Sequence, residues 1–163
     1  NTSGADKKHS ASTTELLSEE LLSHIGRSSA PRTEIVSRRE IRKYATATGW
    51  KKKEYLDGDV APPLFHLPLF WDIVELDQLS PDGVSIDRLL PKFPLEKAMA
   101  GGLDIEYFRP IRAGDVLVAT RTLTNIYEKS GSQGPIIFYE VVMRVETEAG
   151  DLVLTEKTTR LLR

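Results

Sequence analysis

Residues 115–162 decide the fold of this chain, and they read DVLVATRTLTNIYEKSGSQGPIIFYEVVMRVETEAGDLVLTEKTTRLL. Three stretches rich in β-branched and aromatic residues are separated by SGSQGP and by AGD, two short turn sequences that contain glycine. This pattern predicts three long strands that pair in antiparallel order. Strands of roughly ten residues accumulate twist, so we expect a curved sheet that wraps around another element.

We expect the curved sheet to wrap around a helix that precedes these strands in the sequence. Ser37 and Glu40 form a capping box, and the residues that follow predict a helix from Arg38 to Thr48, with Gly49 at its end. The apolar face of this helix has the spacing of helical turns and consists of Ile41, Tyr44, Ala45 and Thr48. A long central helix wrapped by a curved antiparallel sheet is an α+β fold.

Smaller elements are expected in the rest of the chain. Ser12 and Glu15 form another capping box and predict a helix that ends near Gly26. Short strands are predicted for residues 33–36 and 101–111.

The remaining segments are expected to be irregular. Residues 61–94 contain many prolines and predict irregular structure with one or two short helical turns. We expect residues 14–163 to form a single domain. The polar residues 1–13 predict a disordered leader or a remnant added in cloning.

The composition excludes several classes of function. The 163 residues carry 22 Lys and Arg against 24 Asp and Glu, a formal charge of −2, which does not favour binding to nucleic acid or to an anionic membrane. The sequence contains no apolar run near the roughly 18 residues of a membrane span and no signal-peptide pattern. Cysteine is absent, which fits a cytoplasmic protein. The three histidines are not spaced near carboxylates as a zinc site requires, so we expect no metal.

Two glycine-containing motifs are candidates for ligand contacts. RPIRAGD, residues 109–115, is a tight connection between strands, in which Arg109 and Arg112 could alternatively meet a phosphate or a carboxylate. AGG contains Gly101 and Gly102, which allow close approach of either a ligand or a neighbouring strand.

The segment GWKKKEYLDGDVAPP, residues 49–63, contains a run of three cations: Lys51, Lys52 and Lys53. Lysines after a helix end are normally solvated. The alternative is a docking site for the phosphates of a nucleotide-like ligand.

His66 is the histidine with an interior setting, because it lies in PPLFHLPLF. A lone histidine among leucines is typical of a hydrogen-bonded core residue. The alternative is a general base that Asp57 or Asp59 orients. The sequence has no G-x-S-x-G elbow that would support a serine nucleophile.

The order of these features resembles the MaoC-like, hot-dog-fold hydratases and dehydratases of acyl-coenzyme A (CoA) and acyl-carrier-protein chemistry. The resemblance is strongest to the amino-terminal, FAS1-type dehydratase half of the double hot-dog members, in particular the mesaconyl-CoA and itaconyl-CoA hydratases. It rests on four stretches in this order: EIVSRREIRKYATATG, APPLF, FPLEKAMAGGLDIEYFRPIRAGDVL and IYEKSGSQGPIIFYEVVMRVETEAGDLVLTEKTTRLLR. The fold implied is the hot-dog fold, a helix wrapped by a curved antiparallel sheet.

The resemblance also assigns a role to the segment after Gly49. Active members carry D-x-N-P-x-H there, and the aspartate and histidine position the water that adds to an enoyl thioester. In GWKKKEYLD, Trp50 falls at the aspartate position and Tyr55 at the histidine position. Tryptophan has no titratable group, and a tyrosine with an unperturbed pKa near 10 is a poor base at neutral pH. The resemblance therefore implies an active-site loop without its acid/base pair.

Three functions remain open at this point. The chain is expected to be a subunit of an (R)-specific enoyl-thioester hydratase or 3-hydroxyacyl-thioester dehydratase, paired with a competent hot-dog chain. It could alternatively be a self-sufficient thioesterase, or a non-catalytic acyl-thioester-binding protein, in each case as a homodimer or heterodimer. We expect no cofactor besides CoA or acyl-carrier protein as the carrier of the acyl group. If the chain is active alone, the catalytic candidates are His66, Asp57 and Asp59. The expected contacts to substrate or CoA are Tyr55, His66, Gly101, Gly102, Arg109, Arg112, Lys51, Lys52 and Lys53.

Overall fold

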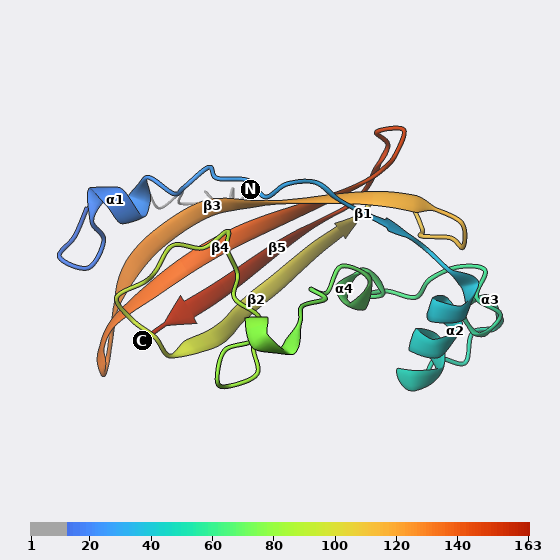
Figure 1. The fold of residues 1–163 in the computed structure, drawn as a ribbon, viewed down its shortest axis with the longest axis horizontal. Coiled ribbons are helices and arrows are strands. Elements are labelled where there is room, and N and C mark those ends of the chain that lie inside the picture. Colours follow the sequence, from blue (N-terminus) through green and yellow to red (C-terminus); the bar gives the residue numbers. More distant parts are fainter. Residues whose placement is uncertain (1–12) are drawn as a thin grey trace, which may run out of the picture.

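A five-stranded antiparallel sheet dominates the computed structural model, which describes residues 13–163 (Figure 1). The strand order in the sheet is β1-β3-β4-β5-β2, and every neighbouring pair is antiparallel. The bounds are β1 Arg32–Ile35, β2 Ala98–Tyr107, β3 Val116–Gly131, β4 Gly134–Thr147 and β5 Leu152–Leu162.

The central strands β3, β4 and β5 confirm the predicted meander. The β3–β4 turn closes at Gly131 and Gly134 and the β4–β5 turn at Gly150, and the last two have positive φ angles of 120° and 95°. Register shifts occur at 123/125 in β3 and at 145/146 in β4. Such irregularities increase the local bend of a strand, and the sheet is curved as expected (Figure 1).

The helices are short. Their bounds are α1 Glu19–Leu22, α2 Arg38–Ala47, α3 Lys53–Leu56, α4 His66–Leu69 and a 3-10 turn, η1, at Leu76–Gln78. The helix predicted from Glu15 is reduced to α1 because Ser18 caps it, accepting a hydrogen bond from the backbone N–H of Leu21. Ser12 and the rest of the predicted leader, up to residue 12, lie outside the described residues.

The helix α2 forms as predicted, but its position differs from the expectation. Figure 1 places α2 and α3 beyond one end of the sheet, and α4 lies between them and the strands. The expectation that α2 is the wrapped helix is therefore corrected. Only Ile41 and Ala45 of α2 are buried, so α2 covers the end of the core rather than the face of the sheet. The segment beside the sheet is α4, a single helical turn.

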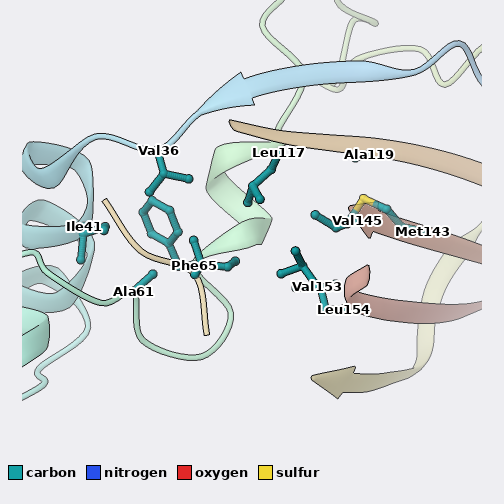
Figure 2. Close-up of a cluster of buried hydrophobic side chains, with 11 residues drawn as sticks. Val36, Ile41, Ala61, Phe65, Leu117, Ala119, Met143, Val145, Val153 and Leu154 are labelled. Carbon is teal, nitrogen blue, oxygen red and sulfur yellow. The ribbon is translucent and has the colours of Figure 1, made fainter. Parts of the chain in front are cut away.

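Two apolar clusters hold the fold together. The first joins α2, the segment before α4 and the strands, and Figure 2 shows Phe65 between Ile41 and the sheet residues Leu117, Val145 and Val153. The second lies toward the other end of the sheet and includes Leu123, Ile126 and Ile137 with Leu17 and Leu21. Phe65 is buried in the first apolar cluster. Its packing restrains the position of the adjacent His66 at the start of α4.

None of the helices in residues 13–163 is long and apolar enough to cross a membrane.

Candidate functional site

The loop after α2 carries the first part of the candidate site. Gly49 has a φ angle of 79°, and the N–H of Trp50 donates to the carbonyl of Ala45 at 3.0 Å, so the chain turns sharply out of the helix. The short helix α3 then brings Tyr55 back onto Trp50. The two rings meet edge to face, with centroids 5.0 Å apart and planes at 80°.

A glycine lets this loop return against α2. Gly58 has a φ angle of 78°, and a Cβ atom there would lie 2.5 Å from the carbonyl oxygen of Arg38. The chain beyond it pairs with the β2–β3 connection, where the N–H of Ala61 donates to the carbonyl of Ile111 at 2.8 Å. The loop after α2 and the RPIRAGD connection are therefore neighbours in space.

These segments surround a cavity of about 500 Å³, which we call the loop cavity. Its volume lies in the range of small-molecule sites, roughly 300–1,000 Å³. Most of its wall is apolar and comes from residues 60–65 and 107–111. The loop cavity brings together five of the residues predicted from the sequence: Lys52, Tyr55, His66, Arg109 and Arg112.

The cations around the loop cavity differ in their partners. Arg109 binds Asp115 at 2.8 Å, and Asp115 also accepts from the backbone N–H of Arg112. The side chain of Arg109 is therefore held within the RPIRAGD connection. The side chain of Arg112 forms no ion pair with another described residue, so it is the cation best placed to meet an anion.

The three lysines of residues 51–53 have different surroundings. Lys52 lines the loop cavity, binds Glu54 at 2.6 Å and lies over the ring of Tyr55. The hydrogen bond to Glu54 and the charge of that carboxylate raise the pKa of Lys52. Lys53 is exposed and pairs with Asp57. Lys51 is exposed and does not line the loop cavity.

His66 is fully buried, and its partner is a residue that the sequence analysis did not select. The Nε2 atom of His66 lies 3.1 Å from Oε2 of Glu156 in β5, which is also buried. The two aspartates expected beside His66 bind cations instead: Asp57 pairs with Lys53, and Asp59 pairs with Arg38. The structure therefore does not bring either aspartate to the imidazole.

Tyr107 is a second residue that the sequence analysis missed. Its hydroxyl oxygen accepts a hydrogen bond from the N–H of Leu64 at 3.0 Å, and its ring meets His66 edge to face. Leu64 has a φ angle of 70°, a strained backbone conformation for a residue other than glycine. Tyr107 thus holds the strained turn that leads into α4.

The two glycines of AGG lie in β2, apart from the loop cavity. A Cβ atom on Gly101 would lie 3.0 Å from the carbonyl oxygen of Thr159, at a register shift between β2 and β5. Close approach of a neighbouring strand explains Gly101. Neither Gly101 nor Gly102 lines the loop cavity.

A second cavity, of about 530 Å³, lies between α4 and the strands β4 and β5, and we call it the sheet cavity. Its apolar wall includes Leu67, Phe70, Val141 and Met143. Within residues 13–163, we find no group of three or more His, Cys, Asp or Glu side chains that could hold a metal ion.

The sequence comparisons agree with this geometry. The family described as FAS1-like, dehydratase domain region, matches residues 23–156. The chain belongs to this family. Mesaconyl-C(4)-CoA hydratase of Chloroflexus aurantiacus is 33% identical over 81 residues, which are 49% of this chain but only 29% of that enzyme. A UPF0336 protein of Streptomyces coelicolor is 28% identical over 154 residues and is matched over 92% of its length.

Solved structures show the same fold for this FAS1-like dehydratase domain. The ChsH1-ChsH2 complex from Mycobacterium tuberculosis superposes with a TM-score of 0.64 at 16% identity, over 83% of each chain. The HadBC (3R-hydroxyacyl-ACP dehydratase) complex of that organism gives 0.53 at 16% identity, over 84% of this chain and 96% of the other. A MaoC-like dehydratase from Rhodospirillum rubrum gives 0.54 at 16% identity, over 85% and 91%. The hot-dog fold is thereby confirmed, and the family match confirms the resemblance to FAS1-type dehydratases.

Proposed function

We propose that this FAS1-like dehydratase domain is the substrate-pocket half of an (R)-specific enoyl-thioester hydratase or 3-hydroxyacyl-thioester dehydratase. A partner hot-dog chain supplies the aspartate and the histidine that handle the reacting water. This proposal refines the family assignment, which reaches as far as the hydratase and dehydratase class.

The observation that carries the proposal is the packing of Trp50 on Tyr55 beside the loop cavity. The resemblance places these two aromatic residues where active relatives have their acid/base pair. Water addition needs groups that exchange a proton near neutral pH, and an indole and a phenol do not. Tyr55, packed against Trp50, instead forms part of the cavity wall, so this chain is suited to binding rather than to proton transfer.

The loop cavity suits a thioester carried by CoA or by a carrier protein. Its wall is mainly apolar, as an acyl chain requires, and Arg112 and Lys52 stand at it to meet phosphate. Similar proteins support both carriers: one relative is a CoA hydratase, and one similar structure is a 3R-hydroxyacyl-ACP dehydratase.

The edge strand β2 is the surface we assign to the partner chain. It lies at one end of the strand order, and nearly all its residues are exposed, among them Met99 and Leu103. An exposed edge of ten residues offers its free backbone groups to another strand. Two similar structures are complexes with two differently named components, ChsH1-ChsH2 and HadBC, which supports a heteromeric assembly.

Reconstitution tests the proposal. The purified chain is mixed with a MaoC-like chain from the same genome that carries the D-x-N-P-x-H motif, and hydration of crotonyl-CoA is followed. We expect the mixture to turn over faster than the partner alone, and a complex of the two chains to elute together in size-exclusion chromatography. No complex and no gain in rate with any such partner would contradict the proposal.

A further inference from the structure

The loop cavity and the sheet cavity share a single described residue, His66. His66 belongs to the lining of both cavities, and no other residue in 13–163 belongs to the two linings. Two cavities of about 500 and 530 Å³ thus adjoin at His66.

Three contacts hold His66 in that place. Glu156 binds its Nε2 atom from β5 at 3.1 Å, and the ring of Tyr107 contacts its edge, with centroids 6.5 Å apart. The third is the backbone, because His66 begins α4 and its neighbour Phe65 is buried in the first apolar cluster. The imidazole is fully shielded from solvent, so it lies buried where the two cavities adjoin.

An aliphatic chain cannot easily displace this side chain. Moving His66 breaks its contact with Glu156 and leaves a buried carboxylate without its partner, and methylene groups offer no hydrogen bond in exchange. The cost of an unpaired buried polar group is large compared with the gain from burying one or two methylenes. The Nδ1 atom of His66 is also buried without a hydrogen-bond partner among the described residues, so an aliphatic chain would meet a polar ring.

We infer that the His66–Glu156 pair is a partition that sets the acyl chain length accepted by this chain. His66 is the specificity-determining residue, and Glu156 is a positioning residue that holds it. The loop cavity takes a short acyl group, and the partition excludes longer aliphatic chains from the sheet cavity. The inference rests on the proposed function, because it requires that an acyl thioester enters the loop cavity.

Binding of two saturated thioesters, butyryl-CoA and decanoyl-CoA, tests the partition by isothermal titration calorimetry. We expect the unaltered chain to bind decanoyl-CoA no more tightly than butyryl-CoA, since the added methylenes stay outside. In His66→Ala the passage is open, and each buried methylene contributes to affinity. The preference for decanoyl-CoA over butyryl-CoA should then rise by roughly tenfold or more, with little change for butyryl-CoA.

Further variants separate the partition from general effects on stability. His66→Gln keeps a side chain that can bind Glu156, so we expect the unaltered preference. Glu156→Ala removes the positioning carboxylate and should shift the ratio in the same direction as His66→Ala, which keeps the test decisive if His66→Ala does not fold. His24→Ala, which removes a partly buried histidine outside both cavities, should leave both affinities as they are.

The outcomes distinguish this inference from the proposed function. If the unaltered chain binds butyryl-CoA but already binds decanoyl-CoA about tenfold more tightly, or if both cavity-opening variants fold and leave the ratio unchanged, the partition is refuted and the proposed function stands. If the unaltered chain binds neither thioester, the proposed function is wrong, and the inference fails with it.

Discussion

Trp50, in the turn that joins α2 to α3, packs edge to face on Tyr55 of α3, with ring centroids 5.0 Å apart. This contact occupies the place that the resemblance gives to an acid and a base. An aromatic pair of this geometry stabilises a fold beyond the area that it buries. We therefore propose that this loop serves as a rigid support rather than as a site of proton transfer.

The contact between the two rings should be measurable as a coupling free energy. We expect a double-mutant cycle with Trp50→Ala and Tyr55→Ala to give about 0.5–1.5 kcal/mol from urea unfolding, the usual range for such pairs. Trp71 is 70% exposed and serves as the control. Trp71→Ala combined with Tyr55→Ala should show no coupling, and a coupling of the same size in both cycles would refute a specific contact.

Arg112 should contribute more to CoA binding than the other cations of this region. Its side chain has no ion-pair partner among the described residues, whereas Arg109 is bound to Asp115. We expect Arg112→Gln to weaken CoA binding by about tenfold at low salt, with the difference shrinking as salt is added. Lys51→Gln is the control, since Lys51 lies outside the loop cavity. Equal losses in the two variants would contradict this assignment.

The edge strand β2 should be required for assembly with the partner. Leu103→Lys places a charge on this exposed edge, and we expect it to abolish the complex in sedimentation velocity while the chain stays folded by circular dichroism. Ile35→Lys is a matched control, because Ile35 is exposed on β1 at the opposite edge of the sheet. Loss of the complex in Ile35→Lys alone would move the interface to the other edge.

Gly58 should tolerate substitution less well than Gly114. Both have a positive φ angle, but a Cβ atom on Gly58 would meet the carbonyl oxygen of Arg38, whereas Gly114 has no atom within 4 Å. We expect Gly114→Ala to cost about 1 kcal/mol of unfolding free energy from backbone strain alone, and Gly58→Ala about 3 kcal/mol from strain and overlap together. Equal costs in urea unfolding would show that the loop relaxes away from α2.

The strands were predictable because their signals are local. Alternation and glycine turns in residues 115–162 define β3, β4 and β5 without reference to the rest of the chain. The length of α2 was predictable for the same reason, since Ser37 accepts from the N–H of Glu40 as a cap should. The position of α2 beyond the end of the sheet was not predictable, because it depends on which apolar face the sheet covers.

The candidate site was predictable only in part. The loop after α2 and RPIRAGD were selected from the sequence, and the structure brings them together at the loop cavity. Glu156 was missed because it lies 90 residues from His66. A signal was present: in β5 it alternates in phase with Leu154 and Leu162, so a charged residue faces the core.

The most direct test of the proposed function is hydration of crotonyl-CoA by the purified chain alone, followed by the absorbance of the conjugated double bond. Because Trp50 and Tyr55 offer no acid/base pair, we predict no turnover by the folded chain without a partner. Turnover by the chain alone that disappears in His66→Ala would contradict the proposal and place the chemistry at the His66–Glu156 pair.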